Sequence, residues 1–525
     1  FDAPEAGLHD PGLLPDAAVV RARVAAARRA GESVLVLGDF DADGLTGLAI
    51  LTEALRRLGL TVEPYVPDRT DEGHGLSMAA VERARAAGHT LILTADTGSA
   101  SVAEVAAAAN AGIDVIITDH HVLGAVRPDA VGLVNAQRPE STYPDRRLSG
   151  AGIAFKVAQL LLDDSPEARE AALALADLAA VGSIADVVPV VGENRSIVRL
   201  GLARLETSPR PGLAALMRRA RVEPGGISTD DISFGVAPRL NAMGRIGDPA
   251  VAARLLLAAD AETAEQLAEE LELANRRRRE LTVTAMTEAR ASLAAAPEAP
   301  FSVIAGEWPV GIIGLVAGRL AEETGRPTLV LSTAVDPWRG SARSAGGVDL
   351  AAALAACSDL LERFGGHPAA AGCHVAPDRV DELRERLNAF VRARPPADER
   401  PSLSIDLVQS ADAADYVLLH ELAPLEGAGE APPLVGIAGL AVTRVRAANG
   451  GHTQLTLRRG REVVDGIAFG QADLAEQLTE GSEIDVVARL ASRTFAGMET
   501  LQLEVRDVAP AGSLRALRTG RVLTR

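Results

Sequence analysis

Short apolar runs alternate with Ala-rich segments of helical periodicity through the first two hundred residues. The runs are VLVLGD, VEPYV, LILTAD and DVIITD, which start at 34, 62, 91 and 114. They are rich in β-branched residues, as buried strands are. Apolar residues keep helical spacing over 44–58, 77–87, 100–111, 149–163 and 167–181. This alternation predicts an α/β fold with a parallel sheet covered on both faces.

The pattern changes three times further along the chain. One uninterrupted helix is expected over 261–296, a second α/β unit starts after Pro300, and a charged, Pro-rich linker spans 392–402. Five alternating strands then follow, with a helical insert before the fourth, which is typical of a small β-barrel of the OB type. The expected domains are a parallel-sheet domain at 1–207, a connecting helical region at 208–297, a second α/β domain at 298–398, an OB-fold domain at 403–512 and a basic tail at 513–525.

Composition narrows the class of protein. A chain of 525 residues is long enough for about three domains. It has 53 basic and 71 acidic residues, so any nucleic-acid contact must come from local Arg clusters rather than a global positive field. The only cysteines, Cys357 and Cys373, lack zinc-binding spacing and suit a reducing compartment. Without a membrane-length apolar run or a signal pattern, the expectation is a cytoplasmic protein that does not contact a membrane.

Acidic and imidazole side chains follow the predicted strands at the point where each strand ends. They are Asp39, Asp41, Asp43, Asp96, Asp119, His120 and His121, and a later apolar segment carries Asp186. Because the carboxyl ends of parallel strands meet at one sheet edge, these side chains are expected to share a small volume. Carboxylates packed together without a cation would repel, so the cluster predicts a metal site. Mixed carboxylate and imidazole ligands favour Mn²⁺, with Mg²⁺ as the alternative.

Two other interpretations of the first acidic motif, DFDADG, were weighed. A calcium-binding EF-hand loop needs Glu at its twelfth position, which counted from Asp39 is Ile50, so calcium is disfavoured. The motif taken alone could simply cap the following helix. Its combination with the other acidic residues favours the metal site.

Three further segments carry groups suited to binding phosphate. GSARS contains Ser341 and Arg343, and GGHPAAAG contains Gly366 and His367, which mark either a close approach to phosphate or a tight turn. PRLNAMGRIG, expected as a Gly-containing loop, carries Arg239, Asn241 and Arg245. The four arginines at 276–279 are compatible with a solvated helix face.

Taken together, these motifs resemble the DHH phosphoesterase superfamily and, within it, the RecJ family of bacterial single-stranded-DNA-specific exonucleases. The resemblance covers almost the whole chain. It rests on GDFDADGLTG, PDRTDEGHGLS, TADTG, TDHH, GSIADVVP, APRLNAMGRIG, GSARS and GGHPAAAG in the family's order, followed by the OB-type region. It implies a DHH catalytic domain joined by the long helix to a DHH-associated domain.

The resemblance also implies a site with two metal ions, Mn²⁺ or alternatively Mg²⁺. One ion would be held by Asp41 and Asp96, and the other by Asp43, Asp96, His120 and Asp186. Many relatives have a further His ligand where this chain has Leu37, and Asp39 is the natural substitute. The implied catalytic residues are His121, facing the scissile phosphate, and Asp119. Two cations about 4 Å apart would activate water for in-line attack.

The implied substrate is single-stranded DNA, degraded from its 5′ end to 5′-mononucleotides in DNA repair and recombination. Arg69, Ser341 and Arg343 are the expected 5′-phosphate pocket, with His74, Tyr143 and Phe155 considered as stacking residues, although a core role suits Phe155 better. By resemblance, a single-strand-binding protein and a helicase are expected partners of a monomer. The alternatives are a DHH phosphodiesterase of short oligonucleotides or cyclic dinucleotides, an inorganic pyrophosphatase, and an inactive single-strand-binding scaffold.

Overall fold

The computed structural model describes residues 3–69, 72–223, 225–295, 298–345, 347–394, 403–422, 425, 432–495 and 498–514, without side chains at 493–499. The chain divides into two compact units, Phe1–Glu399 and Arg400–Arg525. Most of the predicted linker and the predicted basic tail beyond 514 lie outside the described residues. Among those that are described, no helix has the length and apolar character needed to span a membrane.

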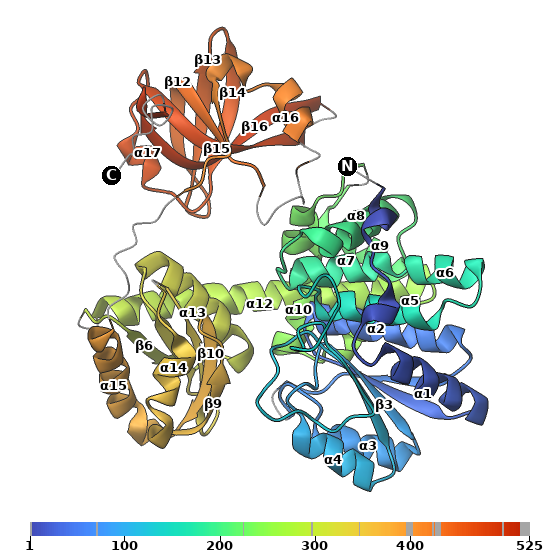
Figure 1. Cartoon of the computed structure of the whole chain (residues 1–525). Coiled ribbons are helices and arrows are strands. Elements are labelled where there is room, and N and C mark those ends of the chain that lie inside the picture. The colour runs from blue at the N-terminus through green and yellow to red at the C-terminus, as the bar shows by residue number, and fades with distance from the viewer. Residues whose placement is uncertain are drawn as a thin grey trace. The chain divides into compact units, whose positions relative to one another are not determined.

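The first unit begins with a five-stranded sheet in which all strands are parallel, in the order β2-β1-β3-β4-β5. Its central strand β3 is labelled in Figure 1. Its strands are β1 Ser33–Gly38, β2 Thr61–Tyr65, β3 Leu91–Ala95, β4 Asp114–Thr118 and β5 Gly132–Val134. The parallel sheet predicted from the four apolar runs is confirmed. Strand β5 was not predicted, because three residues are too few to show a periodicity.

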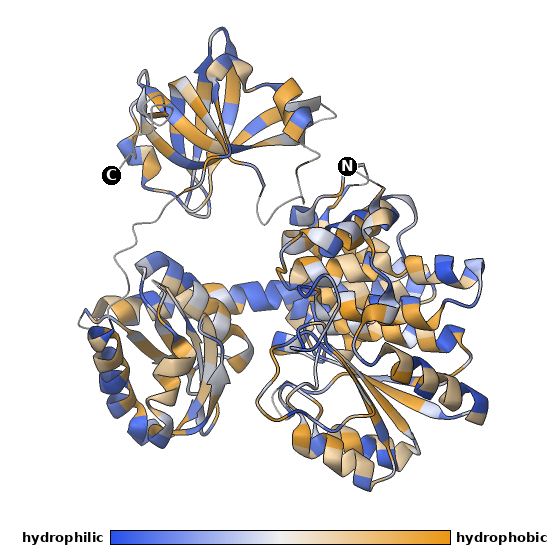
Figure 2. Ribbon diagram, in the orientation of Figure 1, coloured by the Kyte–Doolittle hydropathy of each residue, from blue (hydrophilic) through white to orange (hydrophobic). Residues whose placement is uncertain are grey.

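Alternate residues of each strand enter two separate cores. Val34 and Val36 of β1 pack with helices α1, α2 and α5, whereas Leu35 and Leu37 pack with α3 and α4. These helices are α1 Ala17–Ala30, α2 Ala42–Arg57, α3 Met78–Ala87, α4 Val102–Asn110 and α5 Gly150–Leu161. The hydrophobic colour of the strands in Figure 2 reflects this burial on both faces, which explains why the runs are continuously apolar.

The helix expected over 167–181 is two helices, α6 Pro166–Leu173 and α7 Ala176–Ala185. The first is charged and largely exposed, whereas residues 176–184 of the second are all buried. The chain turns between them because the apolar segment enters the core while the charged segment stays in contact with solvent.

The region after α7 is helical and shares the first core. It contains α8 Gly192–Thr207, α9 Pro211–Ala220, the short π-helix η3 Asp231–Val236, α10 Ala237–Ile246, α11 Ala250–Leu256 and the long α12 Ala261–Ala295. The loop expected at 238–247 was therefore wrong, since these residues form most of α10. A Cβ on Gly244 would lie 2.4 Å from the Phe40 carbonyl oxygen. Here glycine permits close packing rather than a turn.

A second, mixed sheet follows, with strand order β6-β7-β8-β10-β9, and only β6 and β7 are parallel. Its strands are β6 Ser302–Gly306, β7 Thr328–Ser332, β8 Trp338–Arg343, β9 Leu361–Gly366 and β10 Ala370–Val375. The accompanying helices are α13 Val310–Thr324, α14 Leu350–Ala355 and α15 Val380–Ala393. The C-terminal half of α12 packs on α13 through Ala285, Met286 and Ala289, so α12 joins the core shared with α1, α2 and α5 to a core beneath α13 (Figure 1).

The second unit contains a closed five-stranded barrel, because β12 pairs with both β13 and β15. Its strands are β12 Val435–Ala448, β13 His452–Arg459, β14 Glu462–Ala468, β15 Glu483–Phe495 and β16 Met498–Pro510. Helix α17 Leu474–Gln477 precedes β15, as expected, which confirms the OB-type prediction. A short strand, β11 Leu407–Ser410, and helix α16 Tyr416–Leu422 precede the barrel and were not predicted.

Candidate metal centre

Strands β1, β3 and β4 deliver polar residues to one edge of the parallel sheet, and α7 adds another at its C-terminal end. The residues are Asp39, Asp41 and Asp43 after β1, Asp96 after β3, Asp119, His120 and His121 after β4, and Asp186 after α7. Three groups have potential ligand atoms within 4.8 Å of one another: Asp39, Asp41 and Asp96; Asp43, His120 and Asp186; and Asp96, His120 and His121. The structure therefore brings the predicted metal ligands together.

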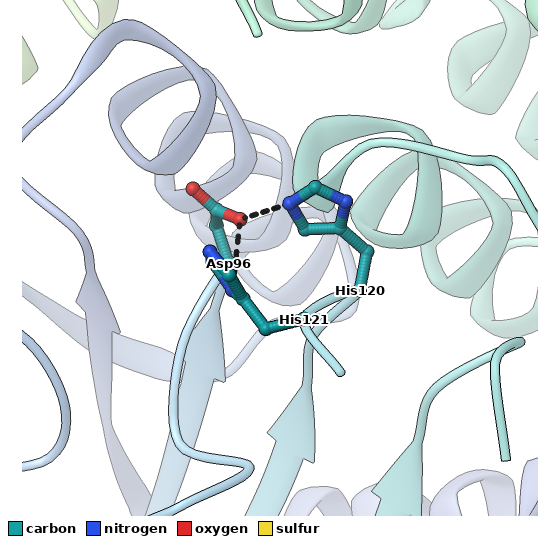
Figure 3. A group of neighbouring side chains, drawn as sticks. All are labelled: Asp96, His120 and His121. Carbon is teal, nitrogen blue, oxygen red and sulfur yellow. Dashed lines mark ion pairs between the residues drawn. The ribbon is translucent and has the colours of Figure 1, made fainter. Parts of the chain in front are cut away.

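His120 lies among three of these carboxylates. Its Nε2 is 3.1 Å from Asp96 Oδ1, 3.6 Å from Asp186 Oδ2 and 4.0 Å from Asp43 Oδ2. Figure 3 shows that both imidazoles of the pair approach Asp96, and His121 Nδ1 is 3.9 Å from the same Oδ1. The Asp96 carboxylate is thus shared between neighbouring groups of ligands.

Several atoms at this site are buried without a hydrogen-bond partner in the described part of the chain. They include Asp39 Oδ1, Asp96 Oδ1 and His120 Nε2. A buried polar atom without a partner is costly, and such atoms usually have a functional explanation. Carboxylate oxygens and an imidazole nitrogen that converge in this way fit a divalent cation such as Mn²⁺ or Mg²⁺.

The surroundings of three of these carboxyl groups, Asp41, Asp96 and Asp186, also disfavour their ionised form. Burial, and then repulsion from Asp39 and Asp43, raises the pKa of Asp41 to about 6. Burial, followed by Asp43 and Asp41, raises the pKa of Asp186 to about 8. The pKa of Asp96 is also raised well above its usual value by burial and by its neighbours. A bound cation would remove this penalty, because it compensates the negative charge directly.

Hydrogen bonds from the N-terminal N–H groups of helices α2 and α5 fix the orientation of the Asp41 and Asp43 carboxylates. Asp41 Oδ1 accepts hydrogen bonds from the backbone N–H groups of Asp43 (3.0 Å) and Gly44 (3.1 Å), which caps α2. Asp43 accepts from the N–H groups of Gly150 (2.7 Å) and Ala151 (2.9 Å) at the start of α5. The capping interpretation of DFDADG is therefore correct for Asp41, and it is compatible with metal binding because each carboxylate retains further lone pairs.

The close approach of α5 and α7 to the acidic residues requires glycine. A Cβ on Gly150 would lie 2.3 Å from Asp96 Cβ, and one on Gly182 would lie 2.6 Å from Asp43 Oδ1. Asp96 itself adopts a left-handed conformation with φ of 62°. Strained backbone of this kind is often found at functional sites.

Asp119 lies behind the two histidines. Its Oδ1 accepts hydrogen bonds from the backbone N–H groups of His120 (2.7 Å) and His121 (3.1 Å) and from His121 Nδ1 (2.8 Å), while Oδ2 accepts from Ser99 N–H (2.9 Å). Burial opposes ionisation of Asp119, but the hydrogen bonds from His121 and Ser99 hold its pKa at about 2. The same hydrogen bond outweighs burial and raises the pKa of His121 to about 9. This geometry suits Asp119 to positioning His121 rather than to contacting substrate.

Two residues that the sequence interpretation missed hold the histidine pair from the other side. Asn135, fully buried after β5, donates from Nδ2 to the His121 carbonyl oxygen at 2.8 Å. Gln137 donates from Nε2 to the His120 carbonyl oxygen, and its own N–H donates to Asn135 Oδ1 at 2.8 Å. The only signal in the sequence was a pair of amide residues directly after a short apolar segment.

Leu37 occupies the position where a further histidine ligand was considered. Its side chain is fully buried in the core beneath α3 and α4. Asp39, two residues later, belongs to the group with Asp41 and Asp96. This placement supports Asp39 as the residue that supplies the missing ligand.

Arg69 and His74 both pack on the ring of Phe40, which lies within the first acidic motif. The His74 and Phe40 ring centroids are 4.3 Å apart, and the Arg69 guanidinium carbon lies 4.9 Å from the Phe40 centroid. His74 Nδ1 is also 3.0 Å from Asp39 Oδ2. We call Asp39, Asp41, Asp43, Asp96 and Asp186 the acidic cluster. Two residues predicted to bind substrate thus lie directly beside it.

Arg245 and Arg343 interact electrostatically with Arg69, and Arg278 interacts with Arg245. Burial, followed by the positive charges of Arg69 and Arg278, lowers the pKa of Arg245 to about 10. Burial and Arg69 also lower the pKa of Arg343, whose Nη1 donates to Ser341 Oγ at 2.9 Å. We call Arg69, Arg245, Arg278 and Arg343 the arginine cluster. For Arg245 and Arg343, the positive charges of other cluster members add to the effect of burial in lowering the pKa, and such a site suits an anion.

The other predicted substrate-binding residues have different surroundings. Arg239 forms a buried ion pair with Glu272, with Nε 2.6 Å from the carboxylate, which joins α10 to α12. Asn241 Oδ1 accepts a hydrogen bond from Ala42 N–H at 2.7 Å and so supports the acidic loop. Gly366 and His367 form the exposed β9–β10 turn, in which His367 N–H donates to the Ala370 carbonyl. The structure thus shows a tight turn at this motif.

Of the three residues considered for stacking, Tyr143 and Phe155 are buried, whereas His74 is exposed. Tyr143 is only 2% exposed, and its hydroxyl donates to Glu193 at 2.7 Å. Phe155 is fully buried. Tyr143 therefore cannot stack on a substrate base, and the stacking prediction for it was wrong because its hydroxyl satisfies a buried acid instead.

Three family models match successive parts of the chain. The DHH family, N-terminal domain matches residues 33–183, the DHHA1 domain matches residues 299–393, and the RecJ OB domain matches residues 405–507. The matches occur in the order expected from the motifs.

Curated relatives extend the similarity over nearly the whole chain. The single-stranded-DNA-specific exonuclease RecJ of Bacillus subtilis is 35% identical over 96% of this chain, which spans 65% of that relative's length. The Thermus thermophilus protein of the same name is 34% identical over 97% of this chain and 72% of its own length. The Escherichia coli protein is 31% identical, with 92% and 88% of the two chains covered.

Solved structures show the same relationship. RecJ from Thermus thermophilus in complex with Mn²⁺ superposes with a TM-score of 0.81 at 32% identity, covering 95% of this chain and 72% of that chain. Its complex with Mg²⁺ gives a TM-score of 0.74 at 30% identity, covering 96% and 74%. With matching domains, sequence and three-dimensional fold, this chain belongs to the RecJ family of DHH phosphoesterases.

Proposed function

We propose that this chain is a metal-dependent exonuclease that degrades single-stranded DNA from the 5′ end to 5′-mononucleotides. The observation that carries the proposal is the pairing of a buried acidic cluster with the arginine cluster. The acidic cluster has unpartnered ligand atoms and suits cations, whereas the arginine cluster suits phosphate. The names of the relatives, single-stranded-DNA-specific exonucleases, support the same substrate.

We infer that the acidic cluster holds two ions, Mn²⁺ or Mg²⁺. Asp39, Asp41 and Asp96 would hold one, while Asp43, His120 and Asp186 would hold the other with Asp96 shared between them. The three overlapping groups of ligand atoms support this division. When bound, the cations would activate water and neutralise charge on the phosphoryl oxygens.

His121 is proposed to assist the departure of the 3′ oxygen. Its Nδ1–H is held by Asp119, so Nε2 is the nitrogen left for substrate, and the side chain is half exposed. An imidazolium held in this way can stabilise negative charge on the phosphate or donate a proton to the leaving oxygen. Burial raises the pKa of both cysteine thiols, so neither is an activated protein nucleophile.

Arg69, Arg245, Ser341 and Arg343 are proposed to receive the 5′-terminal phosphate. The hydrogen bond between Arg343 and Ser341 presents a guanidinium and a hydroxyl side by side. Arg245 Nη1 donates to the Gly311 carbonyl at 3.2 Å, which fixes its position against α13. Guanidinium groups held in this way favour phosphate through charge-assisted hydrogen bonds.

The barrel of the second unit is proposed to bind the strand beyond the reactive end. His452 at the start of β13 and Phe469 directly after β14 form a ring pair with centroids 5.2 Å apart, and Phe469 is 49% exposed. OB folds commonly bind oligonucleotides across their second and third strands. An exposed aromatic ring offers a stacking surface that does not depend on base identity.

Digestion of end-labelled strands tests the proposal. We expect a 5′-labelled single strand to release labelled mononucleotide at once with Mn²⁺, while chelator or a blunt duplex abolishes release. A 3′-labelled strand should release its label only after extensive digestion. Binding without cleavage would instead support the scaffold alternative, and cleavage restricted to dinucleotides or cyclic dinucleotides would support a short-substrate phosphodiesterase.

The family relationship supports several broader expectations, which we retain as proposals. They are action in DNA repair and recombination, a monomeric cytoplasmic enzyme, and cooperation with a single-strand-binding protein and a helicase. Sedimentation of the purified chain, alone and with each partner, would test the oligomeric state and the two interactions.

A further inference from the structure

The Asp39 carboxylate has two different environments. Its Oδ2 lies 3.0 Å from His74 Nδ1, whereas its Oδ1 is buried and has no hydrogen-bond partner among the described residues. Asp39 also belongs to the possible metal group with Asp41 and Asp96. One carboxylate therefore contacts both a candidate metal centre and the segment that carries Arg69.

Phe40 contacts His74 and Arg69 through its ring and helix α10 through its backbone. Its carbonyl oxygen packs against Gly244 of that helix. Phe40 is 1% exposed, so its ring has little freedom to move independently of this packing. A shift of His74 would consequently disturb the surface on which Arg69 lies.

The residues on either side of His74 are held in place by hydrogen bonds that do not involve the acidic cluster. Glu72 accepts hydrogen bonds from the Tyr65 hydroxyl at 2.6 Å and from Asp68 N–H at 3.0 Å. Leu76 N–H donates to Ser101 Oγ at 3.1 Å. Removing the contact between His74 and Asp39 should therefore leave the segment attached to the fold while disconnecting it from the metal centre.

We propose that His74 couples metal binding to recognition of the 5′ end, through its hydrogen bond to Asp39 and its packing on Phe40. His74 is thus a positioning residue that acts through Arg69. Because an ionised carboxylate can only accept hydrogen bonds, His74 Nδ1 carries the proton in this contact. A cation bound by Asp39 would hold its carboxylate in place against repulsion from Asp41 and Asp96. The hydrogen bond to that carboxylate would then fix the position of His74, and packing on Phe40 would in turn fix the position of Arg69. The inference rests on the proposed function, since it assumes that Arg69 reads a 5′-phosphate.

Binding measurements test the coupling without relying on turnover. Single strands with a 5′-phosphate or a 5′-hydroxyl, each with uncleavable methylphosphonate linkages at the 5′ end, are titrated with the full chain in saturating Mn²⁺ and in chelator. The measured quantity is the dissociation constant of the 5′-hydroxyl strand divided by that of the 5′-phosphate strand. In the unaltered chain we expect this ratio to be at least about fivefold larger with Mn²⁺, the lower end of typical coupling between sites.

Two substitutions at His74 separate its hydrogen bond from its bulk. His74→Ala should make the ratio the same in Mn²⁺ and in chelator. His74→Asn should restore part of the metal dependence, because the Asn amide can donate to Asp39 from a position similar to that of Nδ1 but lacks the ring that packs on Phe40. Mn²⁺ affinity is measured for each variant by calorimetry so that all are compared at saturation. His420→Ala, which removes an exposed histidine in the second unit, is the matched control and should behave like the unaltered chain.

Reciprocity gives a second readout. A 5′-phosphorylated strand should tighten Mn²⁺ binding to the unaltered chain by more than a 5′-hydroxyl strand does, by the same factor as the change in ratio, and this difference should vanish in His74→Ala. A metal-dependent ratio that persists in His74→Ala, its absence from the unaltered chain, or failure of His74→Asn to restore any of it would overturn the inference. If the proposed exonuclease activity is wrong, the digestion of end-labelled strands gives no 5′-mononucleotide, and this result is distinguishable from a loss of coupling in the binding measurements.

Discussion

The acidic cluster and the arginine cluster of the first unit differ in sign but share one property. In each, burial and like-charged neighbours push particular groups towards their neutral forms, raising the pKa of Asp186 to about 8 and lowering that of Arg245 to about 10. Arg210 shows the opposite behaviour. Burial lowers its pKa, but ion pairs with Asp177 and Glu53 outweigh burial and raise the pKa above its usual value.

This difference separates charges that stabilise the fold from charges that require a ligand. Arg210 is compensated within the protein and joins α7, α9 and α2. The acidic and arginine clusters are not compensated in this way, and a metal cation and a phosphate are the ligands of opposite charge that each would accept. Four experiments test whether the two clusters require ligands of opposite charge.

Asp96→Asn should have the largest effect. Asparagine tolerates the left-handed backbone at this position, but it removes the negative charge shared between the groups of metal ligands. We expect the cleavage rate to fall by at least about 10³-fold, since several kcal/mol of charge stabilisation would be lost. Asp163→Asn, at an exposed position, is the control. Rates within a few-fold of the unaltered chain in single-turnover cleavage would contradict a shared Asp96.

Asp119→Asn should reduce kcat by about 10²-fold while leaving Mn²⁺ affinity less affected. The amide can no longer accept every hydrogen bond that holds His121 and Ser99, so the imidazole loses its fixed orientation and its raised pKa. Single-turnover rates and calorimetric titration with Mn²⁺ separate the two effects. A loss of metal affinity equal to that in Asp96→Asn would show that Asp119 acts as a ligand instead.

Arg343→Ala tests the opposite charge cluster. Loss of one charge-assisted phosphate contact should weaken the preference for a 5′-phosphorylated strand by about tenfold, with little change for a 5′-hydroxyl strand. Competition binding with the two strands measures the preference. Arg363→Ala, on strand β9 of the same sheet with an exposed side chain, should leave it unchanged, and an equal loss in both variants would exclude a specific role for Arg343.

Metal removal should change how stability depends on pH. In the metal-free chain, the pKa values of Asp41 and Asp186 are raised to about 6 and about 8. Between about pH 4 and pH 8 the folded chain therefore binds more protons than the unfolded chain, and its stability should decrease as pH rises. Mn²⁺ should have its greatest stabilising effect at the upper end of this window, because it competes with those protons.

Thermal unfolding with and without chelator, from pH 5 to pH 8, measures this effect, which we expect to be a few degrees. Asp186→Asn should flatten the decrease in the metal-free chain. A melting temperature that rises across this window in chelator would contradict the raised pKa values.

The sequence alone was enough to predict the main strands and helices and the chemistry of the main site, although it missed β5, β11 and α16. The apolar runs at β1, β3 and β4 end directly before the acidic and imidazole residues, so the topology of a parallel sheet was enough to predict that they meet. The alternating pattern of the last region was likewise sufficient for a barrel, because its strands are half buried and have a clear period of two.

Only the tertiary structure decided which residues act together across distant segments. Asn135 and Gln137 contact the histidine pair through backbone carbonyls, and Phe40 supports Arg69 and His74 through packing. Gly244 looked like a turn residue, yet it lies within α10 against the Phe40 backbone. Periodicity and motif spacing report local conformation, whereas these contacts depend on which surfaces meet once the helices and the sheet have packed.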